Sequence, residues 1–163
     1  MSKKNYENFS LSLALFDALP VIFFCIAMIL IATGFHSEFF IAGAMICTCA
    51  GLGKVVWKII LASAGKDIKP LNKQLRVLMP IGFFLMIAGA VTGMDGAMWR
   101  RLMGNIISFP ANVFFGITMA GMILMSTFAI KLDATKARSH WIEQITNAIA
   151  QGSFLLGVLC CIS

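Results

Sequence analysis

The chain has 163 residues, of which 60% are hydrophobic and only 12% are charged, and its mean hydropathy is +0.90. Soluble domains average about 45–50% apolar and about 25% charged residues, so this composition excludes an ordinary soluble domain. The 13 Lys and Arg outnumber the 7 Asp and Glu, which gives a net charge of +6. In so apolar a chain we expect these charges to orient the protein in a membrane, and we expect no nucleic-acid partner.

Five apolar stretches fill most of the chain, and each is close to the roughly 20 residues that a membrane-crossing helix needs. In hydrocarbon the backbone must satisfy its own hydrogen bonds, so such stretches are helices. Their apolar runs are continuous and lack the alternation of a membrane β-barrel. The sequence therefore predicts an all-α integral membrane protein with one domain, 1–163. Its five transmembrane helices are expected at about residues 19–35, 39–64, 77–94, 109–130 and 141–162.

The segment before the first span is amphipathic. Phe9, Leu13 and Phe16 share one face of a helix, so residues 5–16 are expected to form an approach helix. Asp17 follows directly and has two interpretations: it caps the first span, or it faces the bundle interior. The early lysines are followed by no small-residue cleavage site, so the first span is expected to stay as an anchor.

Two lysines interrupt the second span. Lys54 and Lys58 lie one helical turn apart, and Lys54 lies about 22 Å along the helix from Phe39, within the inner leaflet. Long lysine side chains can snorkel to the headgroups. The alternative is that one of them faces the bundle interior. The basic loop 65–76 follows, and it is expected to face the cytoplasm and to contact anionic lipid or a partner.

The third span has no charge and carries glycines on one face. Gly82, Gly89 and Gly93 recur at helical spacing, and residues 89–93 form a GxxxG motif. Small residues let helix backbones approach closely in a membrane. We therefore predict a packing seam, either within the chain or between protomers. Gly116 in the fourth span is expected to form a second contact of this kind.

Residues 94–108 form the only sizeable outer segment. Trp99, Leu102, Met103 and Ile106 share one face there, with two arginines beside them. Trp prefers the headgroup level, and amphipathic segments lie in the plane of the interface. We expect a short interfacial helix between the third and fourth spans.

The last span begins with a polar stripe. Glu143, Asn147 and Gln151 follow at i, i+4 and i+8, and they drift by only about 80° around the helix. The stripe either lines a cavity or faces headgroups at the interface, where the positive helix N-terminus would stabilise Glu143. If this segment does not cross the membrane, the bundle has four spans.

Several ionisable residues fall at a similar depth in the inner leaflet: Asp17, Lys54, Lys58 and Glu143. Charges at membrane depth tend to pair, to face the interior or to line water. We therefore predict a polar cavity that opens to the cytoplasm, with Glu143 as the central acid and Lys54 as its partner. Neutral polar groups on the same route would be Asn112, Asn147 and Gln151.

The orientation follows from the distribution of positive charge. All Lys and Arg except Arg100 and Arg101 fall on one side of the predicted membrane. The positive-inside rule then predicts a cytoplasmic N-terminus and an outer C-terminus. An uncleaved first span and Lys-rich loops are typical of a bacterial cytoplasmic membrane protein.

The sequence has no arrangement typical of a catalytic, cofactor or metal site. The five cysteines form no CxxC, only two histidines exist, and there is no P-loop or GxGxxG. The first hypothesis is a transporter or channel-type protein for a small solute or ion, acting as a homo-oligomer. The second is a non-catalytic subunit or scaffold of a larger membrane complex. The third is a membrane-embedded enzyme acting on a lipid or thiol substrate.

Overall fold

The structure is a computed structural model of the chain, and it describes residues 11–34, 36–132 and 136–162. These residues form helices joined by short connections, so the prediction of an all-α fold is confirmed for the described part. In chain order the helices are α1 (Leu11–Phe16), α2 (Ala18–Gly34), α3 (Glu38–Ala64), α4 (Lys69–Lys73), α5 (Leu75–Gly93), α6 (Gly96–Ile107), α7 (Ala111–Lys131) and α8 (Ala137–Ile162).

Five helical segments are long and apolar enough to cross a membrane, which indicates an integral membrane protein. They are Leu11–Gly34, Glu38–Ala64, Lys69–Gly93, Ala111–Phe128 and Arg138–Ile162. The first segment starts earlier than the apolar stretch at residue 19, because α1 continues almost directly into α2. The approach helix expected at residues 5–16 corresponds to α1 from Leu11 onward, and its earlier part lies outside the described residues.

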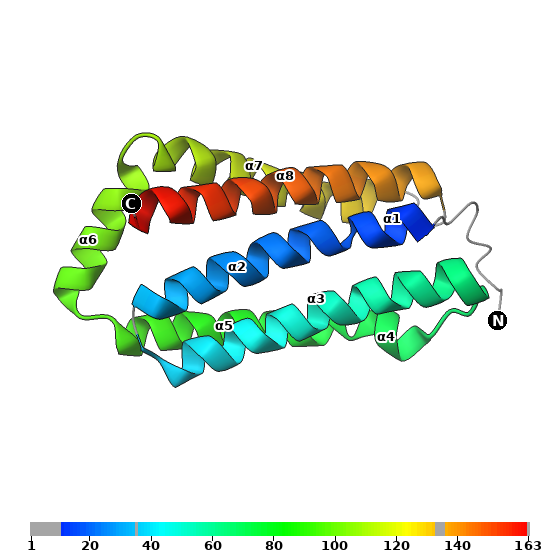
Figure 1. Cartoon of the computed structure of the whole chain (residues 1–163), viewed down its shortest axis with the longest axis horizontal. Coiled ribbons are helices and arrows are strands. Elements are labelled where there is room, and N and C mark those ends of the chain that lie inside the picture. Colours follow the sequence, from blue (N-terminus) through cyan, green and yellow to red (C-terminus); the bar gives the residue numbers. More distant parts are fainter. Residues whose placement is uncertain (1–10, 35, 133–135, 163) are drawn as a thin grey trace.

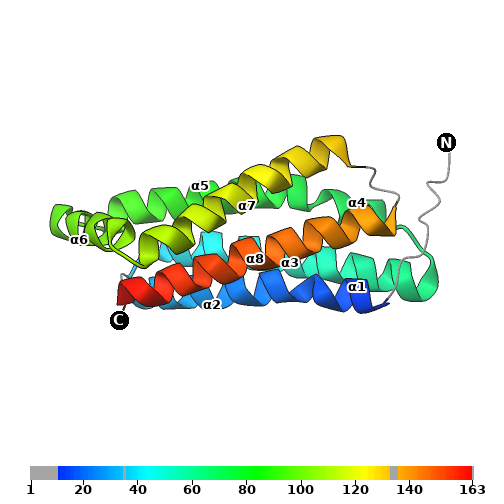
Figure 2. The same cartoon turned by 90° about the horizontal axis from the view of Figure 1, so that it is seen from above.

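Two antiparallel helix pairs form the bundle, and α2 lies between them (Figure 1). One pair is α3 with α5, and the other is α7 with α8, while α2 contacts both α3 and α8. The neighbours therefore follow the order α5, α3, α2, α8, α7. Seen from above, α1 and α2 lie along one side of the bundle, and α5 and α7 lie along the other (Figure 2).

The two ends of the bundle differ. At one end, here called the α6 end, helices α2, α5 and α8 finish, α3 and α7 begin, and α6 packs against α7 and α8. The opposite end, here called the α1 end, holds α1, α4 and the start of α8. The short helix expected within residues 94–108 is therefore present as α6, and it closes one end of the bundle.

Local sequence explains where the helices break. Pro20 has no N–H for the carbonyl of Phe16, and α1 ends at Phe16 while α2 starts at Ala18, which leaves Asp17 between them. Ser37 begins α3, and its Oγ accepts a hydrogen bond from the N–H of Phe40. Gly65 ends α3 in the left-handed conformation, with φ of 61°.

The third-span glycines bring α5 very close to α3. An added Cβ at Gly82 would meet the sulfur of Cys47 and the carbonyl oxygen of Gly43, and one at Gly89 would meet the backbone of Phe40. This contact borders a core cluster of Met28, Phe40, Ala44, Cys47 and Met86. The seam predicted on this face thus runs between α3 and α5 at two of its positions.

The other two predicted packing glycines lie elsewhere. Gly93 is exposed at the last residue of α5. Gly116 is exposed on α7, and an added Cβ there would meet nothing within 4 Å. On α7 the close approach to α8 occurs at Gly121, where an added Cβ would lie 2.6 Å from the Cβ of Ala150. A role for Gly116 between protomers stays a prediction.

Asp95 caps α6, because its Oδ1 accepts hydrogen bonds from the N–H groups of Ala97 (2.9 Å) and Met98 (2.8 Å). Replacing Asp95 with alanine is expected to destabilise α6 by about 1 kcal/mol. Hydrogen exchange of the amides of residues 96–107 should therefore become several-fold faster. Asp95→Asn keeps a capping oxygen and should stay close to the parent protein. Equal exchange in all three proteins would show that the cap contributes nothing.

Candidate functional site

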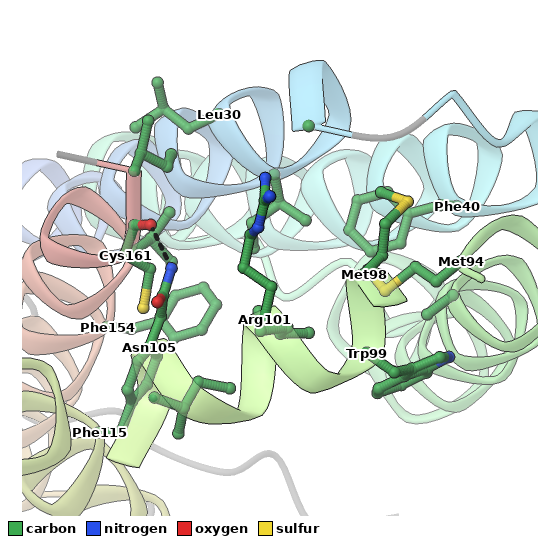
Figure 3. A pocket seen from close by; sticks show the side chains of 17 residues that line it. Leu30, Phe40, Met94, Met98, Trp99, Arg101, Asn105, Phe115, Phe154 and Cys161 are labelled. Atoms are coloured by element: carbon green, nitrogen blue, oxygen red, sulfur yellow. Dashed lines mark hydrogen bonds between the residues drawn. The ribbon is translucent and has the colours of Figure 1, made fainter. Parts of the chain in front are cut away.

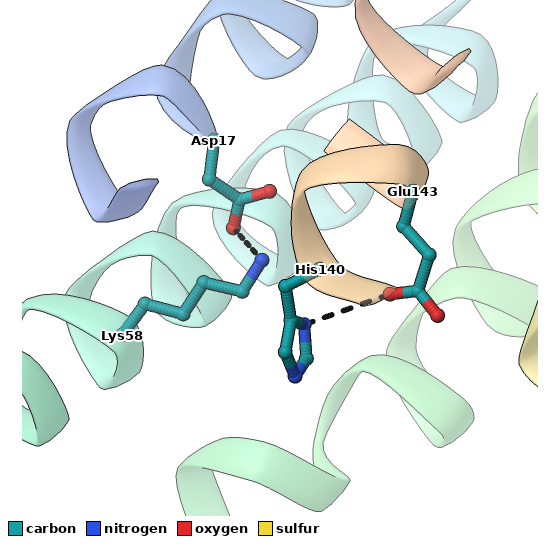
Figure 4. A network of polar contacts seen from close by, with 4 residues as sticks. All are labelled: Asp17, Lys58, His140 and Glu143. Carbon is teal, nitrogen blue, oxygen red and sulfur yellow. Dashed lines mark ion pairs between the residues drawn. The ribbon is translucent and has the colours of Figure 1, made fainter. Parts of the chain in front are cut away.

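A buried ion pair lies at the α1 end. The Nζ of Lys58 lies 2.9 Å from Oδ2 of Asp17, and the two side chains are only 2% and 8% exposed. Lys58 lies in the C-terminal half of α3, and Asp17 lies in the break between α1 and α2 (Figure 4). Charges taken out of water carry a large desolvation cost, which mutual attraction repays only in good geometry. Burying this pair is therefore costly unless the site makes use of it.

A second titratable pair lies beside it on α8. Nδ1 of His140 is 3.6 Å from Oε2 of Glu143, and their side chains are 9% and 20% exposed. Figure 4 shows these two side chains next to the Asp17–Lys58 pair. We call Asp17, Lys58, His140 and Glu143 the charge cluster. It joins the α1–α2 junction, α3 and α8, which are far apart in the sequence.

Lys54 lies at the edge of the charge cluster. Its Nζ is 4.4 Å from the centre of the Trp57 ring, a cation–π distance. Trp57 is buried, and its Nε1 donates a 3.0 Å hydrogen bond to Oδ1 of Asp67 in the loop after α3. Lys54 is also attracted by the charges of Asp17 and Glu143 and repelled by that of Lys58.

The structure shows two pairs that the sequence did not predict: Lys58 lies against Asp17, and His140 lies against Glu143. The predicted partnership of Lys54 with Glu143 stays a prediction. Lys54 and Lys58 are one turn, about 5.4 Å, apart along α3. The Lys58 side chain is buried against Asp17 at the α1–α2 junction, whereas Lys54 is half-buried.

The remaining polar residues of the predicted route are only partly near the charge cluster. Asn147 and Gln151 are half-buried on α8, and Nε2 of Gln151 approaches Sδ of Met122 on α7 at 3.9 Å. The stripe of Glu143, Asn147 and Gln151 thus turns toward α7. Asn112 is exposed near the start of α7, at the opposite end of the bundle, so it does not join the cluster.

Two site residues were not singled out from the sequence. His140 and Gln144 are both buried, and they lie at i and i+4 on the face of α8 beside the polar stripe. In the part of the chain that the structure describes, Oε1 of Gln144 is buried and has no hydrogen-bond partner. The signal in the sequence is the pair of spacings: His140 lies three residues before Glu143 and four before Gln144.

A pocket of about 460 Å³ lies at the α6 end, beneath α6 (Figure 3). Its walls come from α2, α3, α5, α6, α7 and α8, and nearly all lining side chains are apolar. Arg101 points into it, and the side chain of Asn105 donates a 2.9 Å hydrogen bond to the carbonyl of Cys161. No pocket was expected here from the sequence, which places its cavity at the other end.

The described residues form neither a metal site nor a disulfide. Within residues 11–34, 36–132 and 136–162, no group of three His, Cys, Asp or Glu side chains could hold a metal ion. The five cysteines are free thiols. Comparison of the chain with protein-family models, with curated proteins and with solved structures finds no match. What the protein does is therefore inferred from the charge cluster and the pocket.

Proposed function

We propose that this protein is a small multi-pass membrane protein of the transporter or channel type, in which the charge cluster binds or passes a small ion or polar solute. The observation that carries the proposal is the Asp17–Lys58 pair, which is buried between helices of membrane-spanning length. Ionisable residues at such depth typically mark ion or substrate routes. Burying them is costly, so they are usually retained for a function. His140 and Glu143 add groups of the kind that proton relays use.

The unsatisfied amide oxygen of Gln144 supports a polar guest at this site. Buried side-chain oxygens are nearly always hydrogen-bonded, and an exception calls for water, an ion or a ligand. Gln144 lies one turn beyond His140 on α8, so a guest bound there would be next to the charge cluster. Water or a hydrated cation would satisfy such an oxygen.

The charge distribution supports a cytoplasmic opening. Among the described residues, every Lys and Arg other than Arg100 and Arg101 lies at the α1 end or on the half of α3 next to it. By the positive-inside rule this end faces the cytoplasm, which gives a cytoplasmic N-terminus and an outer C-terminus. The helix α6, with Trp99, would then lie at the outer interface. The same features suit a bacterial cytoplasmic membrane.

A second candidate is a non-catalytic subunit of a larger membrane complex. It is favoured by the exposed basic residues around α4: Lys66, Lys69, Lys73 and Arg76. They lie at the same end as the charge cluster and form a positive surface that suits an acidic partner or anionic headgroups. Self-association through the exposed Gly116 face of α7 is compatible with either candidate.

Thiol accessibility tests the proposed route. Single cysteines at positions 143, 147 and 151, in a protein whose five native cysteines are replaced, should react with a small water-soluble thiol reagent in membranes. The matched control is Ile149→Cys on the same helix, where the native side chain is 57% exposed on the outside of the bundle. In lipid this position should react much more slowly than the other three.

The pattern of labelling separates the two candidates. Reaction at 143, 147 and 151 with protection at 149 supports water along the polar stripe. Reaction at 143 alone would mean that Glu143 is an interfacial acid above a packed helix. The transport proposal would then be withdrawn in favour of the subunit, whose function should instead depend on the basic residues around α4.

A further inference from the structure

The pocket beneath α6 has the size and lining of a ligand site. Its volume of about 460 Å³ lies within the range of small-molecule pockets, about 300–1,000 Å³. Leu30 from α2, Met94 from the end of α5, and Phe154 and Val158 from α8 form apolar walls. These walls lie near the ends of helices that are long and apolar enough to cross a membrane, so in a bilayer the pocket would lie at the level of one leaflet.

The charged group that lines the pocket is positive. None of its lining residues is acidic, and Arg101 points into it from α6 (Figure 3). Among the described residues no carboxylate lies within ion-pair distance of Arg101. The Asn105 amide is already engaged by the carbonyl of Cys161. The guanidinium is thus the group that remains to bind a ligand, and its planar fork suits the oxygens of a phosphate.

We propose that this pocket binds an anionic phospholipid, with an acyl chain along the apolar walls and the headgroup phosphate on Arg101. The apolar walls match the acyl chain of such a lipid, and the guanidinium of Arg101 matches its phosphate. Trp99, which also lines the pocket, is a residue type that settles at the headgroup level. The lipid comes from the surrounding bilayer, and the site is independent of the charge cluster at the other end.

Lipid titration with matched arginine variants tests the headgroup contact. The purified full chain in detergent is titrated with phosphatidylglycerol or with phosphatidylcholine of the same acyl chains, and bound lipid is counted by native mass spectrometry. We expect about tenfold tighter binding of phosphatidylglycerol, equal to about 1.4 kcal/mol. Arg101→Gln should abolish this preference. Arg100→Gln removes the same charge from an exposed neighbour that does not line the pocket, so it should keep the preference.

Adjacent native cysteines test the position of the acyl chain. Cys161 lines the pocket and Cys160 does not, although both are half-buried. In two proteins that each keep only one of them, phosphatidylglycerol should slow the reaction of N-ethylmaleimide with Cys161 several-fold and leave Cys160 unchanged. Glycerol 3-phosphate at the same concentration has no chain and should protect neither.

Several results would overturn the proposal. Equal affinity for the two lipids, or an equal loss in Arg100→Gln and Arg101→Gln, would show that surface charge alone attracts the lipid. Protection of Cys161 by glycerol 3-phosphate would show a site for soluble anions. Equal protection of both cysteines would place the lipid around the bundle and not in the pocket. Both arginines are exposed, so neither substitution is expected to prevent folding.

Discussion

Replacing Lys58 with methionine is expected to lower the free energy of unfolding by about 3–5 kcal/mol, because it leaves Asp17 buried without its partner. Methionine keeps the length and most of the apolar volume of the lysine stem, so little packing is lost. Asp17 must then stay charged in the bundle interior or take up a proton, and both cost free energy. The measurement is equilibrium unfolding in mixed micelles, followed by circular dichroism.

The double variant separates the pair from its surroundings. Asp17→Leu together with Lys58→Met replaces the ion pair with apolar side chains, a change that is often neutral or stabilising. We expect it to recover most of the stability lost in Lys58→Met. If Lys58→Met alone is neutral, the pair contributes no stability. If the double variant is as unstable as the single one, the loss comes from packing at Lys58 and not from an unpaired charge.

Gly89→Ala is expected to destabilise the bundle, because overpacking usually costs about 1–3 kcal/mol. The added methyl group would meet the backbone N of Phe40, and Cα of Phe40 at 2.8 Å, so α3 and α5 must move apart. This cost opposes the helix propensity of alanine, which exceeds that of glycine by about 1 kcal/mol. Unfolding in the same micelles measures the difference.

Gly116→Ala is the matched control, since an added Cβ there meets nothing within 4 Å of this chain. We expect its stability to be unchanged or slightly raised. A loss as large as that of Gly89→Ala would mean that Gly116 packs against a second protomer, and it should then be accompanied by a change in oligomeric state on size-exclusion chromatography. A neutral Gly89→Ala would show that the α3–α5 contact can open without cost.

Most of the fold could be predicted from residue order alone. Long apolar runs must form helices in lipid, so α2, α3, α5, α7 and α8 follow from their length and composition. The helix α6 was predictable because Trp99, Leu102 and Ile106 recur at helical spacing between two apolar runs. The spacing of Gly82 and Gly89 likewise marks the face of α5 that meets α3.

The partners within the candidate site could not be predicted in the same way. Lys54 and Lys58 are equivalent in a linear pattern, one turn apart on one helix face. Which of them meets an acid depends on how α3 is rotated and on the level at which α1 ends against it. The structure places Nζ of Lys58 2.9 Å from the Asp17 carboxylate and Nζ of Lys54 over the Trp57 ring.

The sequence by itself determined the class of the protein, the helical segments and the end of the bundle that carries the positive charge. Each of these depends on residues close together along the chain or on the lipid that surrounds an apolar segment. Only the tertiary structure decided the Asp17–Lys58 pair and the pocket beneath α6, which is lined from six helices. The physical reason is that a pocket is the space left between packed helices, and its lining residues share no spacing in the chain.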